Sequence, residues 1–213
     1  EPEPVVWASV YPENADDFTL LRQSLERLRL SDAALSFAEE SSGSLGRGFR
    51  AGFLGLLHLE IVVERLKREF NLTLVVTTPS IGYEVKDLAT GKMTLIYAPH
   101  LFPADTRGYE VMEPWVSASI ILPPNYLGNV IKLFNSHEVV LLTTNNFSED
   151  RSVLEVELPL RELMRHFFDE LKSVSSGFAS FSYQLCGLRL AEVVRLDVLV
   201  GGEIVAPFAR VVS

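Results

Sequence analysis

The stretch from residue 54 to residue 70, LGLLHLEIVVERLKREF, is the clearest indicator of the fold. Its apolar residues recur every three or four positions, as one face of an α-helix requires: Leu59, Val62, Val63, Leu66 and Phe70. Charged residues fill most of the other positions, and Glu64 and Arg68 have the spacing of a supportive i, i+4 ion pair. The stretch therefore predicts an amphipathic helix that packs on a core by one face.

The segments around this helix complete a recognisable order of elements. Residues 5–11 form a β-rich run, and one face of a helix follows at Phe18, Leu21, Leu25 and Leu28. Residues 35–40 and 45–51 indicate a hairpin around the small residues 41–44, and residues 72–78 indicate a closing strand. The predicted order is strand, helix, strand, strand, helix, strand.

The same order recurs in the second half of the chain. Strands are predicted at 116–122, 139–143, 153–158 and 181–185, with a polar turn at 145–150. One helix is predicted by the spacing of Leu127, Val130, Ile131 and Phe134. A second, long helix is predicted by Leu160, Leu163, Met164, Phe167 and Leu171. We expect this helix to be continuous, because its apolar spacing repeats that of the helix at 54–70.

The repeated order predicts an α+β fold of two consecutive ferredoxin-like (βαββαβ) sandwiches with antiparallel sheets. The expected domains are residues 1–80, a hairpin and linker at 81–112, and residues 113–213 with extra C-terminal strands. The composition agrees with folded domains, because 47% of the 213 residues are apolar.

Charge and cysteine content limit the possible functions. With 28 acidic and 19 basic residues the net charge is −9, so any contact with nucleic acid must be local. The single cysteine, Cys186, excludes an internal disulfide framework, and we expect it to be a small core residue. No apolar run is long enough to predict stable membrane insertion. Because the chain begins with Glu1 rather than Met, we expect it to be a fragment of a longer protein.

No motif in the chain predicts a catalytic, cofactor-binding or metal site. The glycines within residues 46–52 lack the spacing of a dinucleotide-binding loop and are expected in a strand and turn. Residues 90–94 lack the Ser or Thr that directly follows the Lys of a phosphate loop, and are expected to form a hairpin turn. His58 and Glu60 have the H-x-E spacing of zinc deaminases, but one cysteine cannot complete the ligand set. His58 is therefore expected on a helix face.

One surface feature favours binding. We define the basic stripe as three cationic residues on one side of the long helix predicted after residue 159, followed by a loop of small residues. The candidate residues are Arg161, Arg165 and Lys172 in the stripe, then Ser173, Ser175, Ser176 and Gly177 in the loop. Such a stripe beside exposed backbone amides could hold phosphates. A solvated helix face with a serine-glycine cap is an equally good interpretation of these residues alone.

Two long motifs resemble the LepA family of translational GTPases, also called elongation factor 4. Three segments resemble the third domain of that family, of which elongation factor G carries a looser version: GFLGLLHLEI at 52–61, ERLKREF at 64–70 and TTP at 77–79. Four others resemble its domain V: EP at 113–114, ELPL at 157–160, FFDELKS at 167–173 and GFASFSY at 177–183.

The resemblance implies a ribosome-binding, signal-transmitting region of a larger GTPase that acts in translation elongation, back-translocation or ribosome assembly. In the family, a GTPase domain and a β-barrel precede domain III, and a distinctive C-terminal domain follows domain V. GTP and Mg²⁺ would be bound by that missing GTPase domain, because the chain has no G-x-x-x-x-G-K-[ST] loop. The fragment is therefore expected to have no enzymatic activity, and its parent to be a ribosome-stimulated GTPase.

The resemblance also implies where the partners lie. Domain III would contact the small ribosomal subunit, and domain V the large-subunit RNA near the sarcin-ricin loop. The segment from Lys172 to Ser180 matches the part that would face that RNA, which favours the basic stripe as an RNA contact. The turn at 135–138 lacks the basic residues usual in the family, and residues 123–125 lack its usual capping Thr.

These departures hint at an organellar or otherwise atypical member of the family. The implied location is the bacterial cytoplasm, a plastid, or the matrix side of the mitochondrial inner membrane, where the protein would be peripheral. Two other functions stay open from the fold alone. One is a regulatory module that binds a small ligand between ferredoxin-like sheets. The other, a small phosphatase-like enzyme, would need an Arg in an anion-cradling loop and a water-binding Asn, which no loop pairs convincingly.

Overall fold

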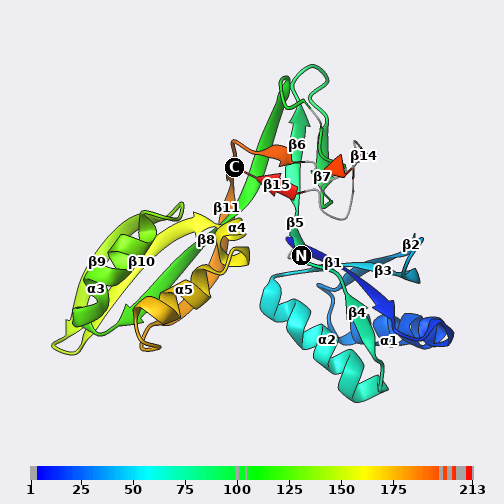
Figure 1. Ribbon diagram of the computed structural model, residues 1–213, viewed down its shortest axis with the longest axis horizontal. Coiled ribbons are helices and arrows are strands. Elements are labelled where there is room, and N and C mark those ends of the chain that lie inside the picture. The colour runs from blue at the N-terminus through cyan, green and yellow to red at the C-terminus, as the bar shows by residue number, and fades with distance from the viewer. Residues whose placement is uncertain are drawn as a thin grey trace. The chain divides into compact units, whose positions relative to one another are not determined.

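The computed structural model describes residues 4–98, 101–103, 105–196, 199–200, 203–204 and 210–212, with side chains up to Val193. The chain divides into two compact units (Figure 1). Unit 1 contains residues 1–82, 95–105 and 195–212, and unit 2 contains residues 83–94, 106–194 and 213. None of the described helices is both long and apolar enough to cross a membrane.

Unit 1 is built on an antiparallel sheet with the strand order β2-β3-β1-β4. Its strands are β1 (Val6–Pro12), β2 (Ser36–Ser42), β3 (Gly46–Phe53), β4 (Leu74–Val76) and β5 (Ser80–Ile81). The first strand lies between the third and the fourth, and β5 pairs with it beyond the end of β4. This is the strand order that the βαββαβ pattern predicts.

Two helices cover one face of this sheet (Figure 1). They are α1 (Phe18–Ser31), preceded by the 3₁₀ turn η1 (Ala15–Asp17), and α2 (Leu56–Phe70). Their buried residues include those that the apolar spacing predicts: Phe18, Leu21, Leu25 and Leu28 in α1, and Leu59, Val62 and Leu66 in α2. Val63 and Phe70 are half-buried at the edge of the contact.

His58 joins the start of α2 to the end of α1. Its Nδ1 accepts a hydrogen bond from the Leu54 N–H at 2.9 Å, and its Nε2 lies 2.7 Å from Asp32 Oδ2. The ring also packs edge-on against Phe53. Because both ring nitrogens have partners within the fold, His58 positions the two helices, as expected for a histidine on a helix face.

Unit 2 repeats this arrangement around one long strand, β8 (Tyr109–Leu122). β8 lies between β10 (Arg151–Pro159) and β11 (Ser180–Leu190), and β9 (Val140–Ser148) pairs with β10. The helical elements are η3 (Pro124–Tyr126), α3 (Leu127–Phe134), α4 (Leu160–Met164) and α5 (Phe167–Val174). The even-numbered residues from 116 to 122 and from 152 to 158 are all buried, so one face of β8 and β10 carries the core. The α+β class with two antiparallel ferredoxin-like sheets is thus confirmed.

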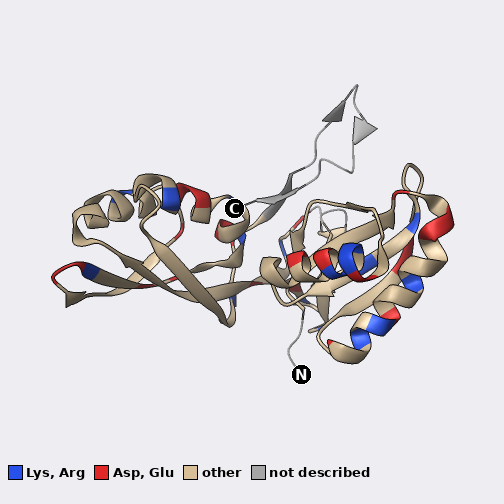
Figure 2. Ribbon diagram, turned by 90° about the horizontal axis from the view of Figure 1, so that it is seen from below, with Lys and Arg blue, Asp and Glu red and all other residues tan. Residues whose placement is uncertain are grey.

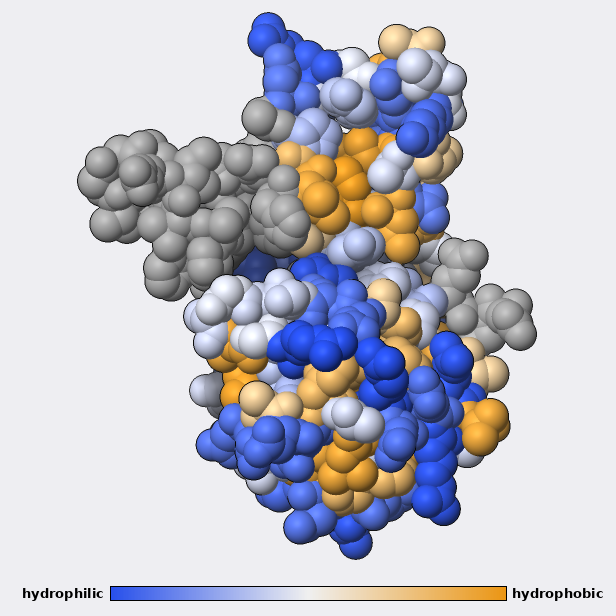
Figure 3. Space-filling view, turned by 90° about the vertical axis from the view of Figure 1, so that its right-hand side faces the viewer, coloured by the Kyte–Doolittle hydropathy of each residue, from blue (hydrophilic) through white to orange (hydrophobic). Residues whose placement is uncertain are grey.

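A hairpin extends the sheet of unit 2. β6 (Tyr83–Asp87) pairs with the first residues of β8, and β7 (Met93–Ile96) pairs with β6. Gly91 in the connecting turn has a φ of 72°, a conformation that favours glycine. Residues 90–92 thus lie in the expected hairpin turn, whereas Met93 and Thr94 already belong to β7. Leu88, Met93 and Leu95 are exposed, and Figure 3 shows an apolar patch over this hairpin.

Several element boundaries differ from the sequence predictions. β8 begins at Tyr109 rather than at residue 116, so it crosses the predicted boundary between residues 112 and 113. The predicted polar turn at 145–150 is shorter than expected, because β9 continues to Ser148 and only Glu149 and Asp150 form the turn before β10. Every residue of β9 is exposed, and an exposed edge strand does not need apolar side chains.

The strand at the opposite edge of this sheet, β11, is also more exposed than its alternating pattern predicts. Apolar and polar residues alternate in this strand, which predicts a half-buried strand, yet Tyr183 and Leu185 are 38% and 42% exposed. Cys186 lies on the same strand and is exposed, so its predicted place in the core is wrong. Among the described strands β11 pairs with β8 alone, so one strand neighbour covers its side chains.

Short strands follow β11. β12 (Val194–Leu196) pairs with β15 (Arg210–Val212), and β13 (Leu199–Val200) pairs with β14 (Glu203–Ile204). Extra strands in this region are expected from the sequence. The predicted strand residue Val198 and the predicted turn residues Gly201 and Gly202 lie outside the described residues.

Candidate nucleic-acid interface

The long helix predicted after residue 159 is two helices. α4 ends just before Arg165, and His166 has a left-handed φ of 68° before α5 begins at Phe167. A left-handed residue cannot continue a right-handed helix. Leu160, Phe167 and Leu171 are still buried, as their spacing predicts. The prediction of one continuous helix is wrong, and so is the alignment of the basic stripe on one helical side.

Arg161 is held inside a cluster of carboxylates rather than presented to solvent. Its Nε lies 2.9 Å from Glu113 Oε2, its Nη1 lies 3.0 Å from Glu162 Oε1, and its Nη2 contacts Glu138. The Arg161 side chain is 11% exposed, and those of Glu113 and Glu162 are 2% exposed. Burial raises the pKa of Glu113, against the opposing effect of the Arg161 hydrogen bond. The guanidinium therefore compensates buried acids.

The turn after α3 is bound to the same cluster. His137 Nδ1 lies 2.7 Å from Glu162 Oε2, and His137 Nε2 lies 3.2 Å from Glu170 Oε2. The His137 ring also packs edge-on against Phe167. Glu138 in the same turn reaches Arg161. Residues 135–138 thus connect α4 with α5 across the break between them.

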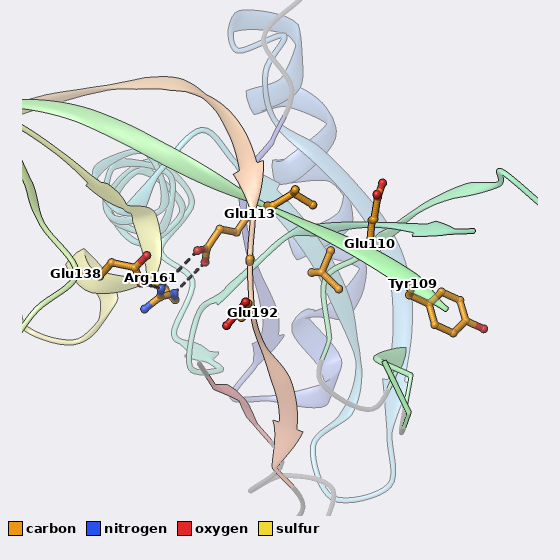
Figure 4. Close-up of a pocket in the computed structure, with 9 residues that line it drawn as sticks. Tyr109, Glu110, Glu113, Glu138, Arg161 and Glu192 are labelled. Atoms are coloured by element: carbon orange, nitrogen blue, oxygen red, sulfur yellow. Dashed lines mark hydrogen bonds and ion pairs between the residues drawn. The ribbon is translucent and has the colours of Figure 1, made fainter. Parts of the chain in front are cut away.

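A cleft of about 660 Å³ opens beside this cluster (Figure 4). Its lining includes one arginine, Arg161, and four glutamates: Glu110, Glu113, Glu138 and Glu192. This balance of charge repels phosphate groups. Within the part of the chain that the structure describes, no His, Cys, Asp and Glu side chains are grouped to hold a metal ion.

Arg165 and Lys172 are the residues of the basic stripe that are not enclosed by the carboxylate cluster, although Arg165 borders it. The Arg165 side chain is 65% exposed, and its Nη1 lies 3.8 Å from Glu162 Oε1. Lys172 lies on α5, with its Nζ 3.3 Å from the Gly177 carbonyl oxygen and above the ring of Phe168. These two cations can reach an anionic partner, whereas Arg161 cannot do so without abandoning buried carboxylates.

The loop after α5 is a compact turn with a defined conformation. The Gly177 N–H donates to the Lys172 carbonyl at 2.7 Å. Ser176 and Gly177 have left-handed φ values of 51° and 82°, which end the helix. Ser173, Ser176 and Gly177 are exposed, so three of the four predicted loop residues lie on the surface.

Ser175, the fourth predicted loop residue, is fully buried. Its Oγ donates to the Leu171 carbonyl at 2.8 Å and accepts a hydrogen bond from the Ala179 N–H at 3.1 Å. Its hydroxyl therefore holds the turn from within and is unavailable to a partner.

Two aromatic residues at this end of unit 2 are not among the sequence-based candidates. Phe178 follows the turn, is 63% exposed, and stacks on Tyr126 with ring centroids 5.7 Å apart and planes at 24°. Asn129 Nδ2 lies 3.5 Å from the Val174 carbonyl, which also brings α3 close to the end of α5. The pair comes from segments far apart in sequence, so spacing alone cannot reveal it.

A charge pattern visible in the sequence marks the same region. Residues 114–137 and 171–191 contain no Asp or Glu, although the whole chain has 28. Their ionised basic residues are Lys132, Lys172 and Arg189. Figure 2 shows the helices of unit 1 banded with both charges, whereas the ribbon of unit 2 is mostly uncharged. These two segments therefore carry positive formal charge, whereas the whole chain has a net charge of −9.

Comparison with known proteins gives two family models in tandem. The model of elongation factor G, domain III, matches residues 1–78, and that of the elongation factor G C-terminus matches residues 110–199. Together they follow the order of the two ferredoxin-like sandwiches.

Curated relatives match across the whole chain. Elongation factor 4 of Microcystis aeruginosa is 42% identical over 212 residues, which are 100% of this chain and 35% of that protein. Elongation factor 4 of Fusobacterium nucleatum is 43% identical over 206 residues, which are 96% of this chain and 34% of that protein. The chain thus spans about a third of the length of these relatives.

A solved structure from Thermus thermophilus has a similar fold. It superposes with a TM-score of 0.51 at 14% sequence identity, over 90% of this chain and 41% of that chain. At this identity the similarity concerns the fold alone.

Proposed function

Since the chain belongs to the LepA family of translation factors, also called elongation factor 4, we propose that it is a ribosome-binding, signal-transmitting region of a larger GTPase. The observation that carries this proposal is the match of about 42% identity over the whole chain, with both elongation factor G domains in order. GTP and Mg²⁺ would be bound, and GTP hydrolysed, by a domain outside these residues. The cellular location proposed is the bacterial cytoplasm, because the relatives described above are bacterial.

In this proposal the two units have different partners. Unit 1 contacts the small subunit, and unit 2 contacts large-subunit RNA near the sarcin-ricin loop through Arg165, Lys172 and the exposed loop residues. The acid-free segments 114–137 and 171–191 support an RNA contact, because a chain with a charge of −9 must avoid carboxylates wherever it meets phosphates. The carboxylate cluster that holds Arg161 removes that residue from the proposed contact.

Ribosome pelleting with charge-reversal variants tests this surface. We expect Arg165→Glu with Lys172→Glu to lower ribosome binding at low salt by about tenfold or more, because each cation lost forfeits a phosphate contact. The matched control is Lys67→Glu with Lys92→Glu, which changes the net charge equally at exposed positions that are not among the proposed unit 2 contact residues. Equal binding by the two double variants would contradict the proposed surface.

A further inference from the structure

The stacked pair of Tyr126 and Phe178 presents an aromatic face to solvent. Phe178 is 63% exposed, although a phenyl ring gains free energy from burial, and its contact with Tyr126 covers one side of the ring. Tyr126 is half-buried at the start of α3. The pair therefore resembles a two-ring platform whose outer side is open.

The backbone around Phe178 is ordered by hydrogen bonds. The Phe178 N–H donates to the Ser175 carbonyl at 2.9 Å, and the buried Ser175 hydroxyl accepts a hydrogen bond from the Ala179 N–H on the other side. Both neighbours of Phe178 in the chain thus belong to a hydrogen-bonded turn. A ring held in this way loses little conformational entropy when a partner stacks on it.

We propose that the pair of Tyr126 and Phe178 is a stacking platform for an unpaired RNA base. The inference deepens the proposed function and rests on it, because it specifies how the α5 end of unit 2 contacts RNA. In this arrangement the base stacks on Phe178, while Lys172 and the exposed residues Ser173 and Ser176 lie near the adjoining phosphates. Aromatic stacking of this kind recognises single-stranded nucleotides in many RNA-binding proteins.

Local charge favours RNA over a basic protein as the occupant. Phe178 lies in the acid-free segment 171–191, and Tyr126 lies in the acid-free segment 114–137. Phe147 offers the opposite case in the same unit, because it is 83% exposed but is followed closely by Glu149 and Asp150. A phosphate backbone approaches a ring more easily when the ring's own segment carries no carboxylates than when two follow it directly, as at Phe147.

The first experiment measures ribosome binding by variants of the 213-residue chain. We expect Phe178→Leu to weaken binding by about 5- to 100-fold, the range for loss of one base stack, and Phe178→Trp to retain it. Phe147→Leu is the matched control and should leave binding unchanged. Because Phe178 is exposed, the leucine variant should also keep the thermal stability of the parent chain, which unfolding experiments can verify.

The second experiment separates stacking from phosphate contacts. The salt dependence of binding should keep its slope in Phe178→Leu, whereas Lys172→Gln should reduce the slope, because only Lys172 releases counterions. A single-stranded RNA oligonucleotide should also bind more tightly than the same oligonucleotide with abasic residues, and Phe178→Leu should abolish that difference.

The outcomes distinguish this inference from the function on which it rests. If charge reversal at Arg165 and Lys172 weakens ribosome binding but Phe178→Leu does not, the platform is wrong and the proposed function stands. If neither change has an effect, the proposed contact itself is wrong. If Phe178→Leu weakens ribosome binding while base-bearing and abasic RNA bind equally, the ring contacts a ribosomal protein, and the RNA platform is overturned.

Discussion

Helix α2 in unit 1 and the pair α4–α5 in unit 2 carry the same apolar spacing, yet one is continuous and the other is broken. α2 runs without interruption from Leu56 to Phe70. In unit 2 the corresponding segment stops at Arg165, passes through the left-handed residue His166, and resumes at Phe167. Periodic burial thus fixes which side chains face a core, but it does not fix the backbone between them.

The charged residues of the two segments also differ in where their partners lie. On α2 the ion pair of Arg65 and Glu69 is formed within one helix and lies partly in solvent. On α4, Arg161 and Glu162 instead pair with residues of β8 and of the turn after α3. Contacts with other elements can hold a helix end in place, whereas contacts within one helix support only its continuation.

The largest expected effect comes from removing Arg161. We expect Arg161→Met to lower the free energy of unfolding by about 3–5 kcal/mol, because it leaves the buried Glu113 and Glu162 without their guanidinium partner. Arg65→Met on α2 should cause a far smaller loss, since its partner Glu69 is solvated. Urea denaturation of both variants measures the comparison, and similar losses would show that the cluster is no more than a surface ion pair.

A smaller effect on the free energy of unfolding is expected at the helix break, where Gly and Ala should rank in the opposite order to that in a continuous helix. His166→Gly should be more stable than His166→Ala by about 1 kcal/mol, because glycine accepts a left-handed φ without steric cost. At Glu64 in the middle of α2 the order should reverse, with Gly less stable than Ala by about 1 kcal/mol. Thermal or urea unfolding of the four variants measures both differences in stability. A preference for Ala at both positions would mean that α4 and α5 form one helix.

The sequence predicts the buried faces better than it predicts this break. Leu59, Val62 and Leu66 on α2, and Phe167 and Leu171 on α5, are buried as their spacing requires. Nothing in the apolar spacing distinguishes His166, because its left-handed conformation arises where the chain turns between α4 and α5. Tertiary contacts determine where a helix is interrupted, and local periodicity carries no information about those contacts.

The candidate site shows the same limit. Lys172 and the exposed residues of the loop after α5 are identifiable from the sequence, because helix-ending small residues have a local signature. The burial of Arg161 among carboxylates is not identifiable from the sequence, since Glu113 and Glu138 contact it from positions 48 and 23 residues away. The pairing of Tyr126 with Phe178 depends in the same way on how α3 and α5 pack.

The smallest effect concerns pH, and it should have opposite signs in the two regions. Burial raises the pKa of Glu113, so folding favours its protonated form, and its contribution to stability is lost as the pH rises through its pKa in the folded state. Hydrogen bonds from Arg65 lower the pKa of Glu69, so its contribution is present above its ordinary pKa and is lost as the pH falls. Urea denaturation between about pH 3 and pH 7 measures the difference in free energy of unfolding between the parent chain and each variant. As the pH rises, the difference between the parent chain and Glu113→Gln should fall, whereas the difference between the parent chain and Glu69→Gln should increase. Slopes of the same sign would mean that the Glu113 carboxylate is as well solvated or as well compensated as that of Glu69, and the contrast between a buried cluster and a surface pair would fail.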